Sequence, residues 1–435
     1  MRRAMPTWFV LLAFVAAFSL VVAACGGDDD DDDDGGSTPG STQTQSSGGD
    51  SGDGVRGFTE AGYKAAGLDK EKLVTIQAGQ PIRIGISSAL SGDVKGLGEP
   101  IAQAAEAAGL GVEIKGFQIE FVREDDLCTP EGGPAAAERL LQKGVVAVVG
   151  PICSGGTAAS LGIYDEAGIT HISPSATSGT LTNPERSEGP YVTFFRTPVL
   201  NSDEAREQAK FLYAQGARKA FIVHDTDDYG TDLAEQFEKF FKEEGGEIVG
   251  SPSGFEKKQA DFSAIINNIK SSGADVVYFA GFYAEATPFI QQMRQDSSLS
   301  DVLFMGSDGV KNDEFISGAK QAAEGAFLAL PGAQGSEFET FAQKYAQISG
   351  GADAAAATFG AEAYDAATAI IKALEQVARE DGGNLVIDLR ELNLAIKNIS
   401  FEGASGKVQF GPNGDRAGAV VRIFKVVNGQ YEQVN

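Results

Sequence analysis

Two short runs of small, hydroxyl-bearing residues have the composition of an anion-binding site. The run Cys153-Ser154-Gly155-Gly156-Thr157 stands between an apolar segment and an amphipathic one, which places Ser154 and several backbone N–H groups at the start of a predicted helix. Unpaired N–H groups and the helix dipole attract negative charge at such a start. A second run, Ser-Pro-Ser-Ala-Thr at 173–177, follows the next predicted strand. Either run alone is equally consistent with simple helix capping.

The elements that must position these runs alternate between strands and helices. From residue 81 onward, β-rich segments at 82–86, 117–123, 145–149 and 170–172 are separated by Ala-rich amphipathic helices at 102–109, 134–143 and 156–167. This rhythm is typical of βαβ units and a parallel sheet. Both runs therefore lie at the carboxyl ends of strands, where the ligands of open α/β sheets collect.

The same rhythm starts again after residues 191–196. Predicted strands at 219–223, 247–249, 275–280 and 302–305 alternate with helices at 203–215, 232–244, 261–271 and 285–295. Two similar sets predict an α/β protein of two similar lobes. Later helices at 337–348, 354–378 and 389–398, and strands at 407–410 and 419–426, must join sheets begun earlier, so we expect two or three crossovers that form a hinge.

Motifs for enzyme chemistry are absent from the sequence. It contains no G-x-S-x-G, no phosphate-binding G-x-x-x-x-G-K-[ST], and no G-x-G-x-x-G after a strand. Two histidines and three scattered cysteines are too few for a zinc site. The run at 225–230 opens like a calcium loop, but Tyr229 and Gln236 stand where oxygen ligands belong. We expect no enzyme activity, no metal and no cofactor.

The net charge of −26 also excludes one class of partner. A chain this acidic repels phosphate backbones, so nucleic acid is not an expected ligand.

The first 24 residues have the layout of an export signal. Arg2 and Arg3 precede seventeen uncharged residues at 8–24, and the segment ends in Val-Ala-Ala-Cys25. This ending resembles the bacterial lipobox, which implies a diacylglycerol on the Cys25 sulfur; an ordinary signal peptide or a permanent anchor helix are the alternatives. Residues 25–54 are a predicted acidic, Gly- and Ser-rich tether. Residues 55–80 form an N-terminal extension with a short helix predicted at 59–66.

Export brings a protein into an oxidising compartment, where cysteines pair. Lipidation of Cys25 would leave Cys128 and Cys153, which we expect to form a disulfide without an odd thiol.

Taken together, the motifs of residues 82–435 resemble those of the bacterial leucine/isoleucine/valine-binding proteins, the type I periplasmic binding proteins of branched-chain amino acid ABC transporters. The segments that carry the resemblance are Gly85 to Gly92, Asp125 to Cys128, Gly150 to Ser154, residues 173–177, Val223 to Asp225 with Tyr229-Gly230, Tyr278 to Phe282, and Phe304 to Val310.

The resemblance implies a type I periplasmic-binding-protein fold and a ligand site between its lobes. It assigns the α-carboxylate of an amino acid to Ser154, to the backbone of Ser175 and to Thr177. It assigns the α-ammonium to Asp308 and Tyr229. Anion donors on one lobe and a carboxylate on the other would need a zwitterion to bridge them.

Three positions depart from the family pattern and concern the side-chain pocket. Leu97 stands where the family has an aromatic residue, Phe282 replaces a tyrosine, and Asp308 is one methylene shorter than the common glutamate.

The function that follows is a lipid-anchored, monomeric solute-binding protein on the outer face of the cytoplasmic membrane. It would capture a branched-chain or aliphatic amino acid and deliver it to ABC permease subunits. The alternative is a sensory receptor domain of the same fold that binds an amide, a short-chain acid or another small polar ligand. We expect lobe 1 to comprise residues 81–199 and 332–408, and lobe 2 residues 200–331 and 409–435.

Overall fold

The computed structural model describes residues 57–183, 190–332, 334–418 and 420–435. The predicted signal peptide, the lipidation site Cys25 and the acidic tether lie outside these residues. Among the described helices, none combines the length and the apolar character needed to cross a membrane.

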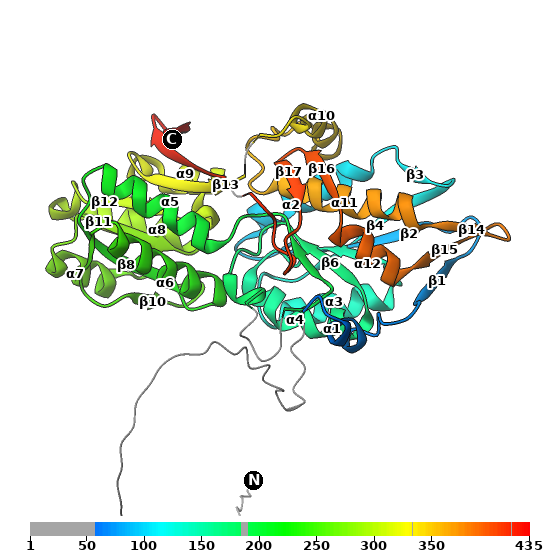
Figure 1. The fold of residues 1–435 in the computed structure, drawn as a ribbon. Coiled ribbons are helices and arrows are strands. Elements are labelled where there is room, and N and C mark those ends of the chain that lie inside the picture. Colours follow the sequence, from blue (N-terminus) through cyan, green and yellow to red (C-terminus); the bar gives the residue numbers. More distant parts are fainter. Residues whose placement is uncertain (1–56, 184–189, 333, 419) are drawn as a thin grey trace, which may run out of the picture. The chain divides into compact units, whose positions relative to one another are not determined.

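The first lobe is built on a six-stranded sheet (Figure 1). Its strands, in spatial order, are β3 (Glu113–Ile114), β4 (Phe117–Asp125), β2 (Ile82–Ser88), β5 (Ala147–Val149), β6 (Thr170–Ser173) and β7 (Phe194–Arg196). All neighbours are parallel except the β3–β4 pair. The connecting helices are α2 (Lys95–Gly109), α3 (Gly132–Gln142) and α4 (Ser154–Ala167). Apolar β-branched residues in β2 and β5 are buried, as a parallel sheet covered by helices requires.

The second lobe repeats this arrangement. Its strands follow the order β10 (Ser253–Phe255), β8 (Lys219–Asp225), β11 (Val276–Ala280), β12 (Leu303–Gly306), β13 (Phe327–Pro331), β18 (Val421–Val427) and β19 (Gln430–Gln433), with β9 (Glu247–Ile248) beside β8. Its helices include α5 (Asn201–Ala214), α6 (Asp228–Glu243), α7 (Ser263–Ser272), α8 (Tyr283–Gln295) and α9 (Asp313–Ala319). In both lobes the first strand lies between the second and the third. The expectation of two Rossmann-like lobes is confirmed.

The chain passes between the two sheets more than once. It leaves the first sheet after β7 and enters the second through α5 and β8. After β13 it returns to α10 (Phe338–Ser349) and α11 (Gly360–Val377), which pack against α2 in the first lobe. It crosses again from the hairpin of β16 (Ser400–Gly403) and β17 (Gly406–Gln409) to β18. This is the multi-crossover topology that the late elements predicted.

The N-terminal extension has a structural role that its sequence did not indicate. Its helix α1 (Glu60–Ala65) begins after Thr59, whose Oγ1 accepts a hydrogen bond from the N–H of Gly62. Strand β1 (Leu73–Ile76) then pairs antiparallel with β15 (Asn384–Asp388), which also pairs with β14 (Arg379–Asp381). This small sheet leads into α12 (Leu389–Lys397). The extension is therefore joined to the late part of lobe 1.

Three predicted helix starts were wrong by more than one turn, including that of α6, which begins at Asp228 instead of residue 232. Helix α2 begins at Lys95 instead of residue 102, and it tolerates Pro100 inside it. Helix α11 begins at Gly360 instead of residue 354, because Phe359 has a positive φ of 59° that no helix can contain. Short 3₁₀ segments complete the described elements: η1 (Gly179–Leu181), η2 (Ser297–Leu299), η3 (Asp308–Val310) and η4 (Lys320–Ala323).

Candidate functional site

A small cavity lies between the lobes, at the carboxyl ends of the strands where the strand order reverses. It has a volume of about 10 Å³, which is room for about one water molecule. Its walls come from both lobes: Leu97, Ile152, Cys153, Ser154, Ser175, Tyr229, Phe282, Asp308, Gly309 and Phe359. Reversal points of this kind are where doubly wound sheets bind their ligands.

On the lobe 1 side, the cavity meets the first turn of α4. Cys153 is the N-cap residue, and no side chain caps this helix start among the described residues. Ser154 is only 2% exposed, and Gly155 and Gly156 are buried beside it. A helix start leaves its first N–H groups without backbone partners, so this buried turn offers them to a ligand. Of the two readings of this run, the uncapped start favours an anion site.

The second hydroxyl run packs against the first. The Ser175 hydroxyl donates to the carbonyl of Ile152 at 2.6 Å, and the N–H of Ser178 donates to Ser154 Oγ at 3.2 Å. The Ser175 N–H has only a long contact of 3.4 Å to Ser173 Oγ. Thr177 is fully buried, and its Oγ1 has no hydrogen-bond partner within the described residues. A buried hydroxyl without a partner is rare, which points to a ligand group as its missing partner.

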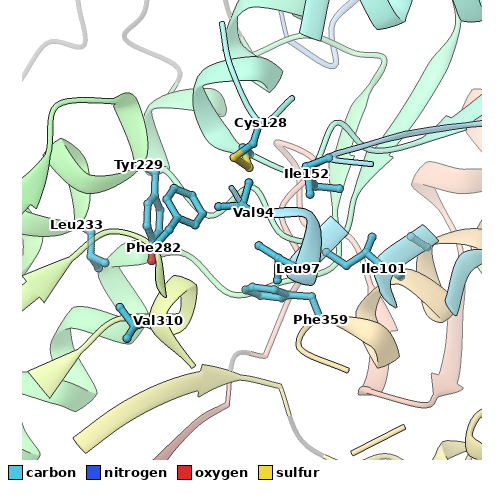
Figure 2. Packing of buried hydrophobic residues seen from close by; sticks show 14 of the residues in the cluster. Val94, Leu97, Ile101, Cys128, Ile152, Tyr229, Leu233, Phe282, Val310 and Phe359 are labelled. Carbon is cyan, nitrogen blue, oxygen red and sulfur yellow. A yellow bond between two sulfur atoms is a disulfide. The ribbon is translucent and has the colours of Figure 1, made fainter. Parts of the chain in front are cut away.

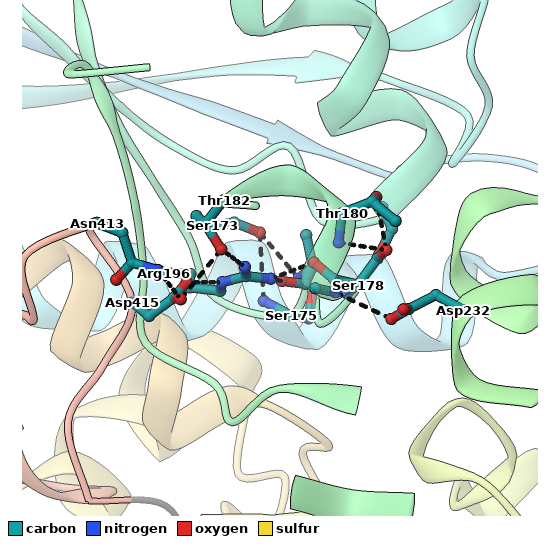
Figure 3. A network of polar contacts seen from close by, with 12 residues as sticks. Ser173, Ser175, Ser178, Thr180, Thr182, Arg196, Asp232, Asn413 and Asp415 are labelled. Atoms are coloured by element: carbon teal, nitrogen blue, oxygen red, sulfur yellow. Dashed lines mark hydrogen bonds and ion pairs between the residues drawn. The ribbon is translucent and has the colours of Figure 1, made fainter. Parts of the chain in front are cut away.

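A buried arginine holds this second run in place (Figure 3). The Arg196 guanidinium is fully buried and donates to the carbonyls of Ala176 at 3.0 Å and Ser178 at 2.7 Å. It also pairs with Asp415 at 2.6 Å, on the segment that leads to the last crossover. These bonds tie the carbonyls of residues 176 and 178 to the arginine.

The disulfide between Cys128 and Cys153 is present, as predicted. It ties the loop after β4 to the N-cap of α4, directly beside the cavity (Figure 2). The buried Asp126 supports the same corner, since its carboxylate accepts hydrogen bonds from the N–H of Cys128 at 2.9 Å and the hydroxyl of Ser87 at 3.1 Å. Burial raises the pKa of Asp126 to about 6 in spite of these bonds.

On the lobe 2 side, an acid and a phenol face the cavity together. Asp308 begins the short segment η3 and is 2% exposed, and Tyr229, in the first turn of α6, donates its hydroxyl to Asp308 Oδ1. The Tyr229 hydroxyl also accepts from the N–H of Gly309 at 3.2 Å. A Cβ at Gly309 would lie 2.6 Å from the carbonyl of Gly281, so only glycine allows this close approach.

The electrostatics of this acid differ from those of a surface carboxylate. Burial raises the pKa of Asp308, and hydrogen bonds from Tyr229 and Glu204 act in the opposite direction. Asp308 forms no ion pair with a described residue, so in its ionised form it would be a buried negative charge that a cation stabilises.

The remaining wall is apolar. Figure 2 shows Leu97 beside Phe359, with the rings of Tyr229 and Phe282 nearby. Those two rings lie 5.1 Å apart between centroids. Leu97 and Phe359 are each 3% exposed. Aliphatic and aromatic groups of this kind make this end of the cavity unfavourable for a charged group and suited to contact with an apolar one.

The structure brings together six of the seven predicted ligand residues on this cavity: Leu97, Ser154, Ser175, Tyr229, Phe282 and Asp308. Thr177 does not line the cavity. Sequence reasoning missed Ile152 and Phe359, which line the wall, and Glu204 and Arg196, which stand behind it. Ile152 could have been found, because it immediately precedes the Cys-Ser-Gly-Gly run.

The calcium-like run at 225–230 has a plain structural use. Asp225 Oδ1 accepts from the N–H groups of Asp227, the N-cap residue of α6, at 3.0 Å and of Gly230 in its first turn at 3.2 Å. The carboxylate therefore holds the start of this helix. The described residues include no cluster of three or more His, Cys, Asp or Glu side chains that could hold a metal ion.

A family model described as periplasmic binding protein matches residues 81–430, which is most of the chain and includes every residue of the cavity. The chain belongs to the periplasmic binding protein family.

Relatives of this periplasmic binding protein are similar to it over most of its length. The leucine-, isoleucine-, valine-, threonine- and alanine-binding protein of Pseudomonas aeruginosa is 30% identical over 353 residues, covering 78% of this chain and 88% of the relative. Among solved structures, the substrate-binding protein of a branched-chain amino acid transporter from Streptococcus pneumoniae, in complex with isoleucine, has a TM-score of 0.71 at 25% identity, covering 82% of this chain and 99% of the other. A leucine-binding protein from Thermotoga maritima has a TM-score of 0.72 at 23% identity, covering 81% and 98%, and shares the fold.

In this periplasmic binding protein the two lobes touch around the cavity. The Lys257 ammonium of lobe 2 donates to the carbonyl of Cys128 at 2.7 Å, and Asp232 Oδ2 accepts from the N–H of Gly179 at 2.9 Å. On the other side, Asn312 Nδ2 donates to the carbonyl of Gly96 at 3.2 Å. These contacts close the cleft around a volume smaller than an amino acid, so the lobes must separate to admit one.

Proposed function

We propose that this protein is an extracytoplasmic solute-binding protein of an ABC importer, and that it captures a branched-chain or aliphatic amino acid between its lobes. The observation that carries the proposal is the opposition of two buried groups across one cavity. Lobe 1 presents the start of α4, which no described side chain caps, and the Thr177 hydroxyl behind the cavity wall lacks a partner among the described residues. Lobe 2 presents the Asp308 carboxylate with Tyr229.

A zwitterion satisfies both sides at once. We propose that its carboxylate accepts hydrogen bonds from the backbone of Ser154 and Ser175 and from the Thr177 hydroxyl, and that its ammonium donates to Asp308 and to the Tyr229 oxygen. Charge-assisted hydrogen bonds in a site shielded from water are about twice as strong as neutral ones. Because each lobe binds one end of the ligand, the binding energy holds the lobes together.

The apolar wall supports an aliphatic side chain on that amino acid. Leu97, Ile152, Phe282 and Phe359 would surround it, and each buried CH₂ contributes about 0.8 kcal/mol. The Pseudomonas aeruginosa relative is named for binding leucine, isoleucine, valine, threonine and alanine, and the Streptococcus pneumoniae structure holds isoleucine. A charged side chain would be buried against this wall without a partner, which disfavours it.

The remaining parts of the proposal concern the cell. Export and the Cys25 lipid would place the protein on the outer face of the cytoplasmic membrane as a monomer, where it would deliver its ligand to the permease subunits and perform no catalysis.

Lobe 1 would comprise residues 81–199 and 332–408, and lobe 2 residues 200–331 and 409–435; the strands of the two sheets support this division.

Titration calorimetry of the whole chain with free amino acids tests the proposal. We expect saturable binding of one L-leucine, L-isoleucine or L-valine per protein, and no detectable binding of L-glutamate or L-lysine. If none of the aliphatic amino acids binds but a short-chain acid or an amide does, the transport proposal is wrong and the result favours the sensory alternative.

A further inference from the structure

A second acid, Glu204, lies directly behind Asp308. It belongs to the first turn of α5 and does not line the cavity. Its Oε1 accepts a hydrogen bond from the backbone N–H of Asp308 at 3.0 Å. Glu204 is fully buried and Asp308 is 2% exposed, so water solvates neither carboxyl group to a useful extent.

Each of the two carboxyl groups has one oxygen atom without a hydrogen-bond partner in the described part of the chain. These atoms are Glu204 Oε2 and Asp308 Oδ2. Buried oxygens of this kind are rarely left unpaired. The two side chains are close enough to hydrogen-bond to each other, and such a bond between two carboxyl groups requires one proton. A single shared proton would supply the donor that a bond between these two carboxyl groups requires.

The described groups packed around the pair supply no countercharge. Tyr229 approaches from α6 and Tyr278 from β11, and both are neutral phenols. The Tyr278 hydroxyl is directed to Gln208 Oε1 at 2.6 Å, and Gln208 in turn donates to the carbonyl of Gly306. Neither Glu204 nor Asp308 forms an ion pair with a described residue. Two ionised carboxylates in contact at such a place would repel each other strongly.

The contacts of the two carboxyl groups favour one of them as the holder of the proton. Asp308 receives the Tyr229 hydroxyl, which stabilises its ionised form. The pKa of Glu204 is raised well above its ordinary value of 4.5, mainly by burial and to a smaller extent by the charge of Asp308. These contacts favour Glu204 as the protonated group and Asp308 as the group that keeps the negative charge.

We propose that Glu204 is a positioning residue that carries one proton, donates it in a hydrogen bond to Asp308, and thereby limits the acid pair to a single negative charge aimed at the ligand ammonium. The inference rests on the proposed function for the ligand, but the protonation of the pair does not depend on it. One charge on the protein then meets one charge on the ligand, so the closed cleft buries no excess charge.

Chemical unfolding of the whole chain without ligand tests the shared proton. Between the ordinary pKa of Glu204 and its raised pKa in the folded protein, the folded state holds one proton more than the unfolded state. We therefore compare the unfolding equilibrium constants of the wild type and of Glu204→Gln. Their ratio, wild type over variant, should rise by about tenfold per pH unit from about pH 5 upward. Glu207→Gln, on the same helix, is the matched control and should follow the wild type. A wild-type to Glu204→Gln ratio that stays constant from about pH 5 to about pH 8 would overturn the proposal.

Titration with L-leucine tests the positioning role. Glu204→Gln keeps an acceptor for the Asp308 N–H and a donor for its carboxylate, so we expect it to weaken binding by no more than about fivefold. Glu204→Leu removes both groups and should weaken binding by at least about tenfold more than Glu204→Gln. An equal loss of leucine affinity in the two variants would show that the charge of Glu204 itself binds the ligand. Equal affinity of Glu204→Leu and wild type would show that Glu204 has no role in binding. If the wild type binds no amino acid, the proposed function fails, while the unfolding measurement still decides the protonation.

Discussion

The Tyr229 hydroxyl donates a hydrogen bond to Oδ1 of Asp308, and both side chains lie on the lobe 2 wall of the cavity. The two residues are held by different elements, the first turn of α6 and the segment η3 after β12. Their contact forms a polar patch of one acid and one hydroxyl within an otherwise apolar wall. It is the counterpart of the uncapped start of α4 in lobe 1.

Removal of the acid should abolish most of the affinity. Asp308→Ala would leave the ligand ammonium buried without its partner, which costs about 2 to 5 kcal/mol. Leucine binding should weaken by about thirtyfold to several thousandfold. The exposed Asp301→Ala is the control and should bind as the wild type does. If Asp308 only caps its turn, thermal melts will show a loss of stability while calorimetry shows full affinity.

Removal of the phenol hydroxyl should have a smaller effect in the same direction. Tyr229→Phe deprives Asp308 of a donor and leaves the N–H of Gly309 without its acceptor. Unpaired buried groups cost about 1 to 3 kcal/mol each, so leucine affinity should fall by roughly tenfold to a hundredfold. Tyr213→Phe, on a face of α5 away from the cavity, serves as control. An unchanged dissociation constant for Tyr229→Phe would show that the hydroxyl takes no part in leucine binding.

The disulfide should stabilise both the fold and the site. Replacing Cys128 and Cys153 by serine together frees a loop of 25 residues and loosens the N-cap of α4. We expect the free energy of unfolding in urea to fall by about 3 kcal/mol, and leucine binding to weaken as well. Unchanged unfolding in the double variant would contradict the structural role of the bridge.

Stability should fall as the pH rises from about 5 to about 7, in part because of Glu362. Burial raises the pKa of this carboxyl to about 7, although Arg416 and Arg422 act in the opposite direction. The folded state then favours the protonated form, so its contribution is complete below the ordinary pKa of 4.5 and is lost as the pH approaches 7. Glu362→Gln should flatten the pH dependence of the unfolding free energy over this range, whereas the exposed Glu339→Gln should leave it unchanged. Parallel curves for wild type and Glu362→Gln would refute this assignment.

Much of the fold and part of the cavity could be predicted because the signals are local. Apolar strands and amphipathic helices alternate with regular spacing, and the runs at 153–157 and 173–177 follow their strands directly. Contacts between distant segments give no such signal. Glu204 meets Asp308 across 104 positions, and Arg196 meets Asp415 across 219. Phe359 reaches the cavity through a positive φ, which is unusual for an aromatic residue and has no marker in the sequence.

The most direct test of the account compares three ligands that differ only in their charged ends. L-Leucine has both charges, 4-methylpentanoate lacks the ammonium, and 3-methylbutylamine lacks the carboxylate. Calorimetry on the wild-type chain should show leucine binding at least about a hundredfold more tightly than either analogue, because each analogue leaves one lobe's buried polar groups unpaired. Binding of 4-methylpentanoate with the affinity of leucine would contradict the bridging of the lobes by a zwitterion.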